Sequence, residues 1–366
     1  MKQLNTTDAL YAANIFSDFY NNFDRIDEYL KEMKLESVGQ IPTSLPGMGL
    51  EDDMFTDFSV HPSEMEFSVS VTDNYTFDTM LDMTATNVIE KSIPGKRLKW
   101  LVKETNSNKV VGFIRFGSPV INSKPRNEFL GDVPPLEAFN RHTIMGFNIV
   151  PTQPFGFNYL GGKLLAMICV SHLARRTLND KYDSKICMFE TTSLYGSSKS
   201  ASMYDGMKPY LRFRGLTESN FIPSIHGPKY LKLKEWFVQK NDGEELVPPD
   251  ASSRKLKTQQ VMISTIKKSL NGTDLENFNK SLQHSLDLTE KKRFFNSDYG
   301  YENVPGIIMR GETPRRKPNF DNYEFDNVIK WWKKKASKRY ENLQNDGRLR
   351  TEQEVWHLKD DIDIIR

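Results

Sequence analysis

Apolar and polar residues alternate along the chain with two periods, which divide it into expected helices and strands. Residues 7–33 repeat apolar side chains every three or four positions, which predicts an amphipathic helix. From 65 to 71, Met, Phe and Val alternate with Glu and Ser, the period of a half-buried strand. A hairpin follows, with strands over 98–103 and 110–116 around an Asn-Ser-Asn turn at 106–108.

The middle of the chain predicts a crossover between two parallel strands. A strand over 143–150 leads through a glycine-bearing turn into a helix over 158–178, and a second strand over 186–191 is expected beside the first after a right-handed connection. The remaining expected elements are helices over 77–91 and 199–207 and strands over 210–214 and 230–238. This order predicts an α+β fold, a mixed sheet flanked by helices, with an N-terminal helix and a C-terminal helical extension.

Composition changes suggest three regions. Residues 1–60 are expected to hold the N-terminal helical segment and a linker, residues 61–240 the sheet-containing core, and residues 241–366 a basic helical region. A Pro-, Gly- and acid-rich stretch after residue 239 marks the second boundary. Within the last region, helices are predicted over 258–270 and 325–343.

The sequence shows neither a membrane or signal segment nor a pattern of cysteines that would form disulfides or bind a metal. The longest apolar run, Leu164 to Val170, is too short to cross a bilayer, and the first residues lack the apolar core of a signal peptide. A soluble cytoplasmic protein without a membrane partner is expected. Cys169 and Cys187 stand in apolar surroundings without further ligands nearby, so neither a disulfide framework nor a metal site is predicted. The oligomeric state is left open.

The turn at 152–163 carries the chemistry that the sequence offers. Glycines at a helix entrance let backbone N–H groups approach an anion, and the helix dipole favours negative charge there. A P-loop is excluded because its lysine needs a following Ser or Thr, whereas Lys163 precedes Leu164. The dinucleotide glycine spacing is also absent. The alternative is that the glycines only allow helix and strand to pack closely.

This turn resembles the acetyl-CoA loop of the GNAT acyltransferases, whose pattern is Q/R-x-x-G-x-G/A. Gln153, Gly156 and Asn158 stand at the three positions, with Asn158 where the family has Gly or Ala. In a second register, the helix start around Gly161, Gly162 and Lys163 is similar to the family's G-I-G-x-x-L-L opening. The resemblance implies that these six residues bind the pyrophosphate of acetyl-CoA or another acyl-CoA, and that the mixed sheet of residues 61–240 forms a GNAT-like core.

A second resemblance, over residues 109–218, is to the Druantia anti-phage protein DruA family, which is similar in turn to the Mom DNA-modification family. The segments that carry it are Phe147–Pro151, Asn158–Leu165, Phe189–Thr192, Tyr204 and Gly215–Thr217. Thr192 departs from the family's Phe, and the family's Trp is missing near Met207. The resemblance implies a place in phage defence or DNA modification.

Three residues are candidates for catalysis if the chain is an acyltransferase. Acyl transfer to an amine needs a base for the amine proton and an acid for the leaving thiolate. The GNAT resemblance implies Glu190 as the base and Tyr204 as the acid, while His142 could act as a base or contact a phosphate. Glu190 could instead cap a helix or pair with Arg212, Tyr204 could serve packing, and His142 could be a surface residue at a strand end.

Charge is distributed unevenly and makes DNA a candidate partner. Residues 1–100 hold 8 Lys and Arg against 17 Asp and Glu, whereas residues 251–366 hold 23 against 17. In the basic part, cations and aromatic residues are interleaved, which suits phosphate contact and base stacking. The residues concerned are Arg315, Arg316, Lys317, Trp331, Lys333 and Lys334. Alternatively, Trp332 docks on the core and the lysines only face water.

Three functions follow from these patterns. The first is a GNAT-like, acyl-CoA-dependent N-acyltransferase that modifies a nucleic-acid base or another amine. The second is a GNAT-derived DNA-binding protein without transferase activity. The third is a scaffold or phage-related interaction protein whose helical flanks mediate assembly. The sequence favours the first without excluding the others.

Overall fold

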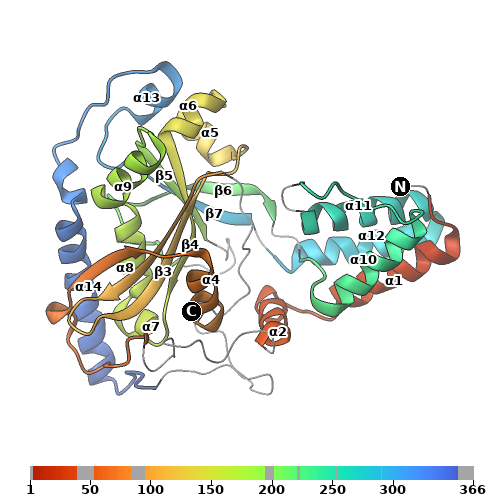
Figure 1. The fold of residues 1–366 in the computed structure, drawn as a ribbon, viewed down its shortest axis with the longest axis horizontal. Helices are drawn as coiled ribbons and strands as arrows, with labels where there is room; N and C mark the ends of the chain where they lie inside the picture. The colour runs from red at the N-terminus through yellow and green to blue at the C-terminus, as the bar shows by residue number, and fades with distance from the viewer. Residues whose placement is uncertain are drawn as a thin grey trace.

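The chain folds into two lobes, a sheet lobe and a helical lobe, which lie side by side (Figure 1). The computed structural model describes residues 3–38, 53–84, 95–193, 202–220, 223–251, 254–289 and 291–352. The sheet lobe contains every strand of the described chain, and the helical lobe combines the N-terminal helices with helices from the second half of the chain (Figure 1).

A seven-stranded mixed sheet organises the first lobe, so the α+β class is confirmed. Its strand order is β1-β2-β3-β4-β5-β7-β6, and only the β4–β5 pair is parallel. The bounds are β1 Phe67–Val71, β2 Arg97–Glu104, β3 Lys109–Gly117, β4 Thr143–Pro151, β5 Met188–Ser193, β6 Arg212–Asn220 and β7 Lys291–Ser297. The predicted hairpin is β2–β3, with Leu101 opposite Phe113.

The two parallel strands are paired over only three residues. Thr143, Ile144 and Met145 of β4 face Met188, Phe189 and Glu190 of β5. Both strands continue beyond this ladder, and on its other edge β5 pairs with β7 from Phe189 to Ser193. The β4–β5 backbone ladder ends at Glu190, one residue further the Thr191 hydroxyl still donates to the Gly146 carbonyl at 2.9 Å, and beyond this contact the two strands no longer pair.

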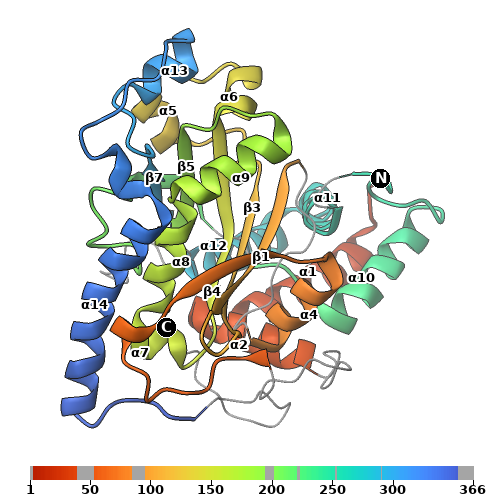
Figure 2. The same cartoon turned by 60° about the vertical axis from the view of Figure 1, so that its left-hand side comes forward.

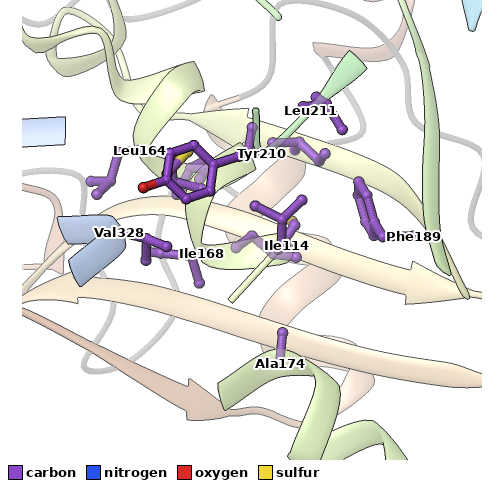
Figure 3. Packing of buried hydrophobic residues seen from close by; sticks show 14 of the residues in the cluster. Ile114, Leu164, Ile168, Ala174, Phe189, Tyr210, Leu211 and Val328 are labelled. Atoms are coloured by element: carbon purple, nitrogen blue, oxygen red, sulfur yellow. The ribbon is translucent and has the colours of Figure 1, made fainter. Parts of the chain in front are cut away.

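Three helices cover one face of the sheet: α8 (Gly161–Cys169), α9 (His172–Tyr182) and α14 (Phe325–Asn345) (Figure 2). The sequence explains their positions, because every residue of α8 except Lys163 is apolar or glycine and α14 carries an apolar stripe. Leu164 and Ile168 of α8 pack with Ile114 and Phe189 of the sheet (Figure 3). This is the main hydrophobic core.

The opposite face is covered by α4 (Asn74–Thr84), α5 (Lys124–Leu130) and α6 (Leu136–His142). A smaller core lies under α4, where Phe77 packs edge-on against Phe113 with ring centroids 5.8 Å apart. Helix α4 begins three residues before the predicted start at 77, and residues 85–91 of that prediction lie outside the described residues.

The helical lobe has its own core, built from Phe16, Phe19, Phe237, Met262 and Phe278 among others. Its helices are α1 Thr6–Asn21, α2 Ile26–Val38, α10 Gly227–Lys240, α11 Arg254–Ser269 and α12 Gly272–Asp287. The remaining short elements are η1 Pro62–Glu64, α7 Phe155–Tyr159, α13 Val304–Arg310 and η2 Phe320–Tyr323. The helical lobe thus combines two helices that precede β1 in the chain with three helices that lie between β6 and β7.

Several sequence expectations differ from the structure. The predicted helix over 7–33 is two helices, α1 and α2, with a break after Asn21. Residues 230–238 lie in α10 rather than in a strand, because Leu233 and Phe237, four residues apart, both face the core of the helical lobe. Residues 202–207 form turns instead of a helix, and residues 199–201 lie outside the described part.

The predicted helix over 158–178 is divided into three. Leu160 has φ 54°, in the left-handed region, and separates α7 from α8. Ser171 separates α8 from α9, because its side chain accepts a hydrogen bond from the Ala174 N–H and caps the new helix. The position of these breaks depends on capping and backbone conformation, which the apolar pattern does not report.

The C-terminal region contributes to the sheet lobe. Strand β7 was not expected from the sequence, yet it lies between β5 and β6. The apolar stripe of α14 packs on the main core through Val328, Trp332 and Tyr340. No helix in the described ranges is long and apolar enough to span a bilayer. Cys169 and Cys187 are free and buried.

Candidate functional site

Glu190 lies where β4 and β5 part, and its carboxylate is completely enclosed. Arg126 of α5 pairs with it, with Nη1 3.1 Å from Oε1, and both side chains have essentially no exposure. The same guanidinium donates to the carbonyl of Val120 at 2.8 Å and to that of Ile121, and stacks over the Phe139 ring at 4.3 Å. Arg126 thereby joins α5, α6 and the 120–121 loop to the sheet.

The electrostatics of Glu190 are set by burial. Removal from water raises the pKa of this carboxyl from 4.5 to about 7, while the charge and hydrogen bond of Arg126 act in the lowering direction. A carboxyl with a pKa near neutrality can exchange a proton at physiological pH, the property that a general base requires. Structural ion pairs also perturb carboxyl pKa values, so the shift alone assigns no role.

Further polar groups lie on the same face of the sheet. Asn296 of β7 stands opposite Glu190, and its Oδ1 accepts a hydrogen bond from Arg214 Nε at 2.8 Å. Four buried polar atoms, three on α5 and its N-cap and one on β4, have no hydrogen-bond partner among the described residues: Ser123 Oγ, Arg126 Nε, Asn127 Oδ1 and Asn148 Oδ1. Buried polar atoms are rarely left unpaired, so this face is a candidate site.

Tyr204 lies on the other face of the sheet. Its ring packs against that of Phe295, with ring centroids 5.3 Å apart, and Phe295 stands opposite Thr191 in the β5–β7 ladder. Thr191 directly follows Glu190, and successive side chains of a strand point to opposite faces. The structure therefore does not bring Tyr204 and Glu190 together.

His142 is the last residue of α6 and precedes β4. Its Nδ1 is 2.7 Å from the carbonyl of Lys185, and burial lowers its pKa. It stands three positions before Met145, the residue of β4 that faces Glu190. Three strand residues span about 10 Å, too far for direct proton transfer between the two side chains.

The polar side chains of the glycine-bearing turn bond to the protein itself. Gln153 Oε1 accepts from the Phe157 N–H at 3.2 Å. Asn158 exchanges two hydrogen bonds with the backbone of Arg350, at 2.7 and 3.1 Å. Lys163 Nζ donates to the carbonyls of Met203 and Asp205.

The glycines of the turn also face neighbouring side chains. A Cβ on Gly156 would lie 2.6 Å from Gln153 Nε2, and one on Gly161 would lie 2.8 Å from both Phe155 and Pro151. A Cβ on Gly162 would lie 2.3 Å from the end of Met203. These contacts fit the close-packing interpretation of the glycines. Helix α8 moreover covers the sheet face opposite Glu190.

The predicted nucleic-acid residues fall into two groups. Arg315, Lys317 and Lys333 each have carboxylates nearby: Glu302 and Glu312 at 3.9 and 3.7 Å from Arg315, Asp298 beside Lys317, and Glu66 at 2.6 Å from Lys333. Arg316 is exposed and stacks on Phe320, Lys334 is exposed, and Trp331 is half-buried against Tyr210. Trp332 is fully buried, as the alternative interpretation expected, and donates to the Tyr159 carbonyl.

The outer surface of α14 carries a basic stripe, which we call the α14 lysine ridge. It consists of Lys330, Lys334, Lys335 and Lys338, and all four are exposed. None of them forms an ion pair within the part of the chain that the structure describes. Lys335 Nζ lies 5.8 Å from the centre of the Trp331 ring. Of this set, the sequence made Lys334 a candidate nucleic-acid residue, and the spacing 330, 334, 338 places three lysines on one helical face.

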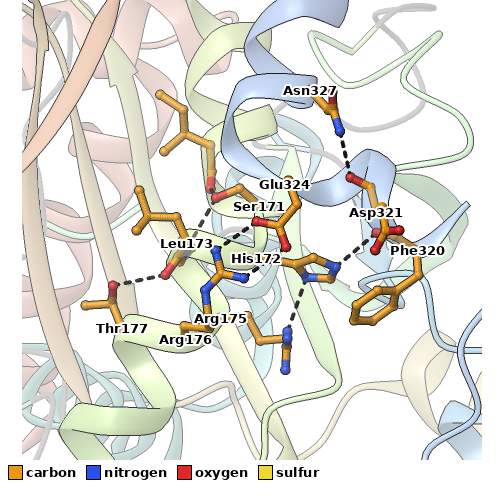
Figure 4. A network of polar contacts seen from close by, with 12 residues as sticks. Ser171, His172, Leu173, Arg175, Arg176, Thr177, Phe320, Asp321, Glu324 and Asn327 are labelled. Carbon is orange, nitrogen blue, oxygen red and sulfur yellow. Dashed lines mark hydrogen bonds and ion pairs between the residues drawn. The ribbon is translucent and has the colours of Figure 1, made fainter.

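A polar network holds the start of α14 against α9 (Figure 4). Arg176 makes a double hydrogen bond to Glu324, at 3.0 and 2.8 Å. His172 is buried between Arg175 Nε, which donates to its Nδ1, and the Phe320 carbonyl, which accepts from its Nε2. Burial lowers the pKa of His172 to about 4, so it is neutral at pH 7. The network fixes the ridge relative to the sheet.

Comparison with known proteins finds one family that is similar to a central segment of the chain. The family described as Druantia protein DruA matches residues 73–200, about a third of the chain. The matched segment contains Arg126, Glu190 and the glycine-bearing turn, and it ends before β6 and β7. No curated protein and no solved structure matches the chain.

Proposed function

We propose that this chain is a nucleic-acid-binding protein of an anti-phage defence system, similar in its central segment to DruA. The observation that carries nucleic-acid binding is the α14 lysine ridge, with the half-buried Trp331 beside it. Unpaired lysines release counterions from nucleic-acid phosphates, and an accessible indole edge can contact a base or sugar. The defence context comes from the DruA match over residues 73–200.

The position of the ridge supports this function. Trp331 packs against Tyr210, with ring centroids 5.8 Å apart, and Lys335 is close enough to Lys163 to influence its pKa. The ridge therefore lies close to Tyr210, two residues before β6 begins at Arg212, and to Lys163 of α8. The buried stripe of the same helix is fixed by Trp332, so the lysines are carried on a rigid element, which is favourable for a binding surface.

Binding of labelled DNA to the full chain, measured by fluorescence anisotropy at a series of salt concentrations, tests the proposal. Duplex and single-stranded oligonucleotides are both titrated. We expect the logarithm of affinity to fall linearly with the logarithm of salt concentration. Absence of binding to both oligonucleotides at low salt, with the protein folded by circular dichroism, would overturn the proposal.

Acyl transfer is a second candidate, favoured by one observation. β4 and β5 pair over three residues and part at Glu190, whose pKa is raised to about 7. In GNAT-like enzymes the acyl thioester lies between two such strands and a carboxylate acts as the base, so Glu190 would accept the proton of the attacking amine. For this step the Arg126 guanidinium would either move away from the Glu190 carboxylate or remain paired with it while the proton is accepted. The glycine-bearing turn, with Gly161 and Lys163, would hold the pyrophosphate only if the side chains now bonded to it moved away.

Calorimetry with CoA and acetyl-CoA separates the two candidates. Acyl transfer requires that one of them binds and that Glu190→Gln lowers turnover while leaving this binding nearly intact. If neither binds to the wild-type chain, the acyltransferase proposal fails and nucleic-acid binding is unaffected.

A further inference from the structure

A pocket of about 330 Å³ lies at the start of α4, beside the end of β1 and the start of β2. Its lining is Val71, Thr72, Asp73, Asn74, Arg97, Lys99 and Lys181. These residues come from the end of β1, the start of α4, the start of β2 and the end of α9. Neither the glycine-bearing turn nor the α14 lysine ridge contributes to it.

Three cations face one carboxylate in this lining. The single acid, Asp73, is occupied with the helix start, since its Oδ1 accepts the Thr76 N–H at 2.9 Å. Arg97 and Lys181 are exposed, and no carboxylate pairs with either of them within the described ranges. The Lys181 ammonium donates to the Arg97 carbonyl at 2.9 Å, which holds the two residues together.

Lys99 forms the buried wall of the pocket. Its side chain is only 3% exposed, and its one carboxylate partner, Asp78, lies 2.5 Å away. Arg115 stands beside it on β3, in direct register. Burial lowers the pKa of Lys99, its hydrogen bond and ion pair with Asp78 raise it, and the positive charges of Arg115 and Arg97 lower it further. Arg115 and Arg97 therefore add positive charge around the Lys99–Asp78 pair, which an anion in the pocket would stabilise.

We propose that this pocket binds a phosphate group, held by Arg97 and Lys181 at its mouth and by the field of Lys99 at its base. Thr72 and Asn74 supply hydroxyl and amide groups for the phosphate oxygens. A guanidinium and an ammonium at the mouth of a pocket suit a compact oxyanion with several acceptor oxygens. The phosphate could be carried by a nucleic-acid end or by a small molecule. The proposal is independent of DNA binding by the α14 lysine ridge.

Calorimetric titration of the full chain with inorganic phosphate tests the site directly. We expect binding to the wild type, and roughly tenfold weaker binding to Arg97→Ala and to Lys181→Ala, as for loss of one charge-assisted hydrogen bond. Lys181→Arg keeps the charge and should retain most of the affinity. Lys185→Ala removes one exposed lysine outside the pocket and serves as the matched control.

Thermal unfolding of each variant without phosphate checks that the fold is intact. Both changed residues are exposed, so midpoints close to the wild type are expected. Absence of phosphate binding to the wild type, or equal affinities in Arg97→Ala, Lys181→Ala and Lys185→Ala, would overturn the proposal.

A second pair of titrations identifies the source of the phosphate. A 5′-phosphorylated oligonucleotide is compared with the same oligonucleotide bearing a 5′-hydroxyl. Tighter binding of the phosphorylated form that disappears in Arg97→Ala supports the site and indicates a nucleic-acid end. Equal binding of both forms, together with phosphate binding that Arg97→Ala weakens, supports the site and indicates a small phosphorylated molecule.

Discussion

Arg126 and Glu190 form an ion pair in which neither side chain reaches solvent, with Nη1 3.1 Å from Oε1. The two residues are 64 positions apart in the sequence, and their contact ties helix α5 to the central strand β5. Because the pair lies where β4 and β5 part, it supports the sheet at the point where the parallel ladder ends.

Removal of the guanidinium should destabilise the fold strongly. Arg126→Met removes the counter-charge and hydrogen bond of Glu190, so the buried carboxyl must either take up a proton or stay charged without its partner, which costs about 3 to 5 kcal/mol of unfolding free energy. Lys124→Met is the matched control, because Lys124 and Glu218 form an exposed pair at 3.6 Å, a kind that contributes little. Urea denaturation measures both, and equal losses in the two variants would show that Arg126 has no special role.

The pH dependence of stability should reveal Glu190. Its pKa is raised to about 7 in the folded state from 4.5, so the folded chain holds this proton more tightly than the unfolded chain does. Stability from this group is fully present below about pH 4.5 and is lost as pH rises towards 7 and above. Glu190→Gln cannot lose that proton, so the variant should gain about 3 kcal/mol relative to the wild type between pH 5 and pH 8.

Other groups titrate in the same range, and His172 has the opposite sign because its pKa is lowered to about 4. Their contributions cancel when the free energy of unfolding of the wild type is subtracted from that of Glu190→Gln at the same pH. Denaturation curves of both proteins at several pH values give this difference. A difference that stays constant from pH 5 to pH 8 would mean that Glu190 does not titrate in this window.

Two glycines of the turn before α8 should respond differently to alanine. Gly161→Ala places a methyl group 2.8 Å from Phe155 and Pro151 and 3.0 Å from the Gly156 backbone, which should cost about 1 to 3 kcal/mol. Gly162→Ala meets only the flexible end of Met203, which is 40% exposed and can turn away, so a cost below about 1 kcal/mol is expected. Thermal or urea unfolding compares them, and a larger loss in Gly162→Ala would contradict the packing described for this turn.

Much of the sheet could be predicted from the sequence, for reasons that particular residues explain. The alternation before Val71 and the turn at Asn106 to Asn108 report local geometry, so β1, β2 and β3 were found. β7 was missed because its place between β5 and β6 depends on pairing with strands about 75 and 100 residues earlier, which no local period reports.

The two neighbouring tryptophans of α14 should separate binding from stability. Trp332 is fully buried, so Trp332→Ala should cost about 3 to 5 kcal/mol and can prevent folding. Trp331 is half-buried beside Lys335, so Trp331→Ala should cost less while weakening DNA binding by about 1 to 3 kcal/mol, the range for a stacked base. Unfolding and anisotropy titrations measure the two effects, and unchanged DNA affinity in a folded Trp331→Ala protein would count against the aromatic contact.

Less of the candidate site than of the fold could be predicted from the sequence. Glu190 was identified as a candidate base, with a helix cap or an ion pair with Arg212 as the alternatives, and the structure pairs it with Arg126 instead. Arg126 stands in a short helix between two loops, and nothing in the local pattern indicates that it is fully buried. That Glu190 and Tyr204 lie on opposite faces follows from the alternation at Thr191, which becomes informative only once the contact of Tyr204 with Phe295 is known.

The salt dependence of DNA affinity in a ridge variant tests the central proposal most directly. The triple variant Lys330→Ala, Lys334→Ala, Lys338→Ala is compared with a control that removes three exposed lysines of the helical lobe, Lys267, Lys268 and Lys280. Loss of up to three phosphate contacts should reduce the magnitude of the slope of log affinity against log salt by roughly 2 to 3, with a much smaller change in the control. Equal slopes in the ridge variant and the wild type, with both proteins folded, would contradict nucleic-acid binding through α14.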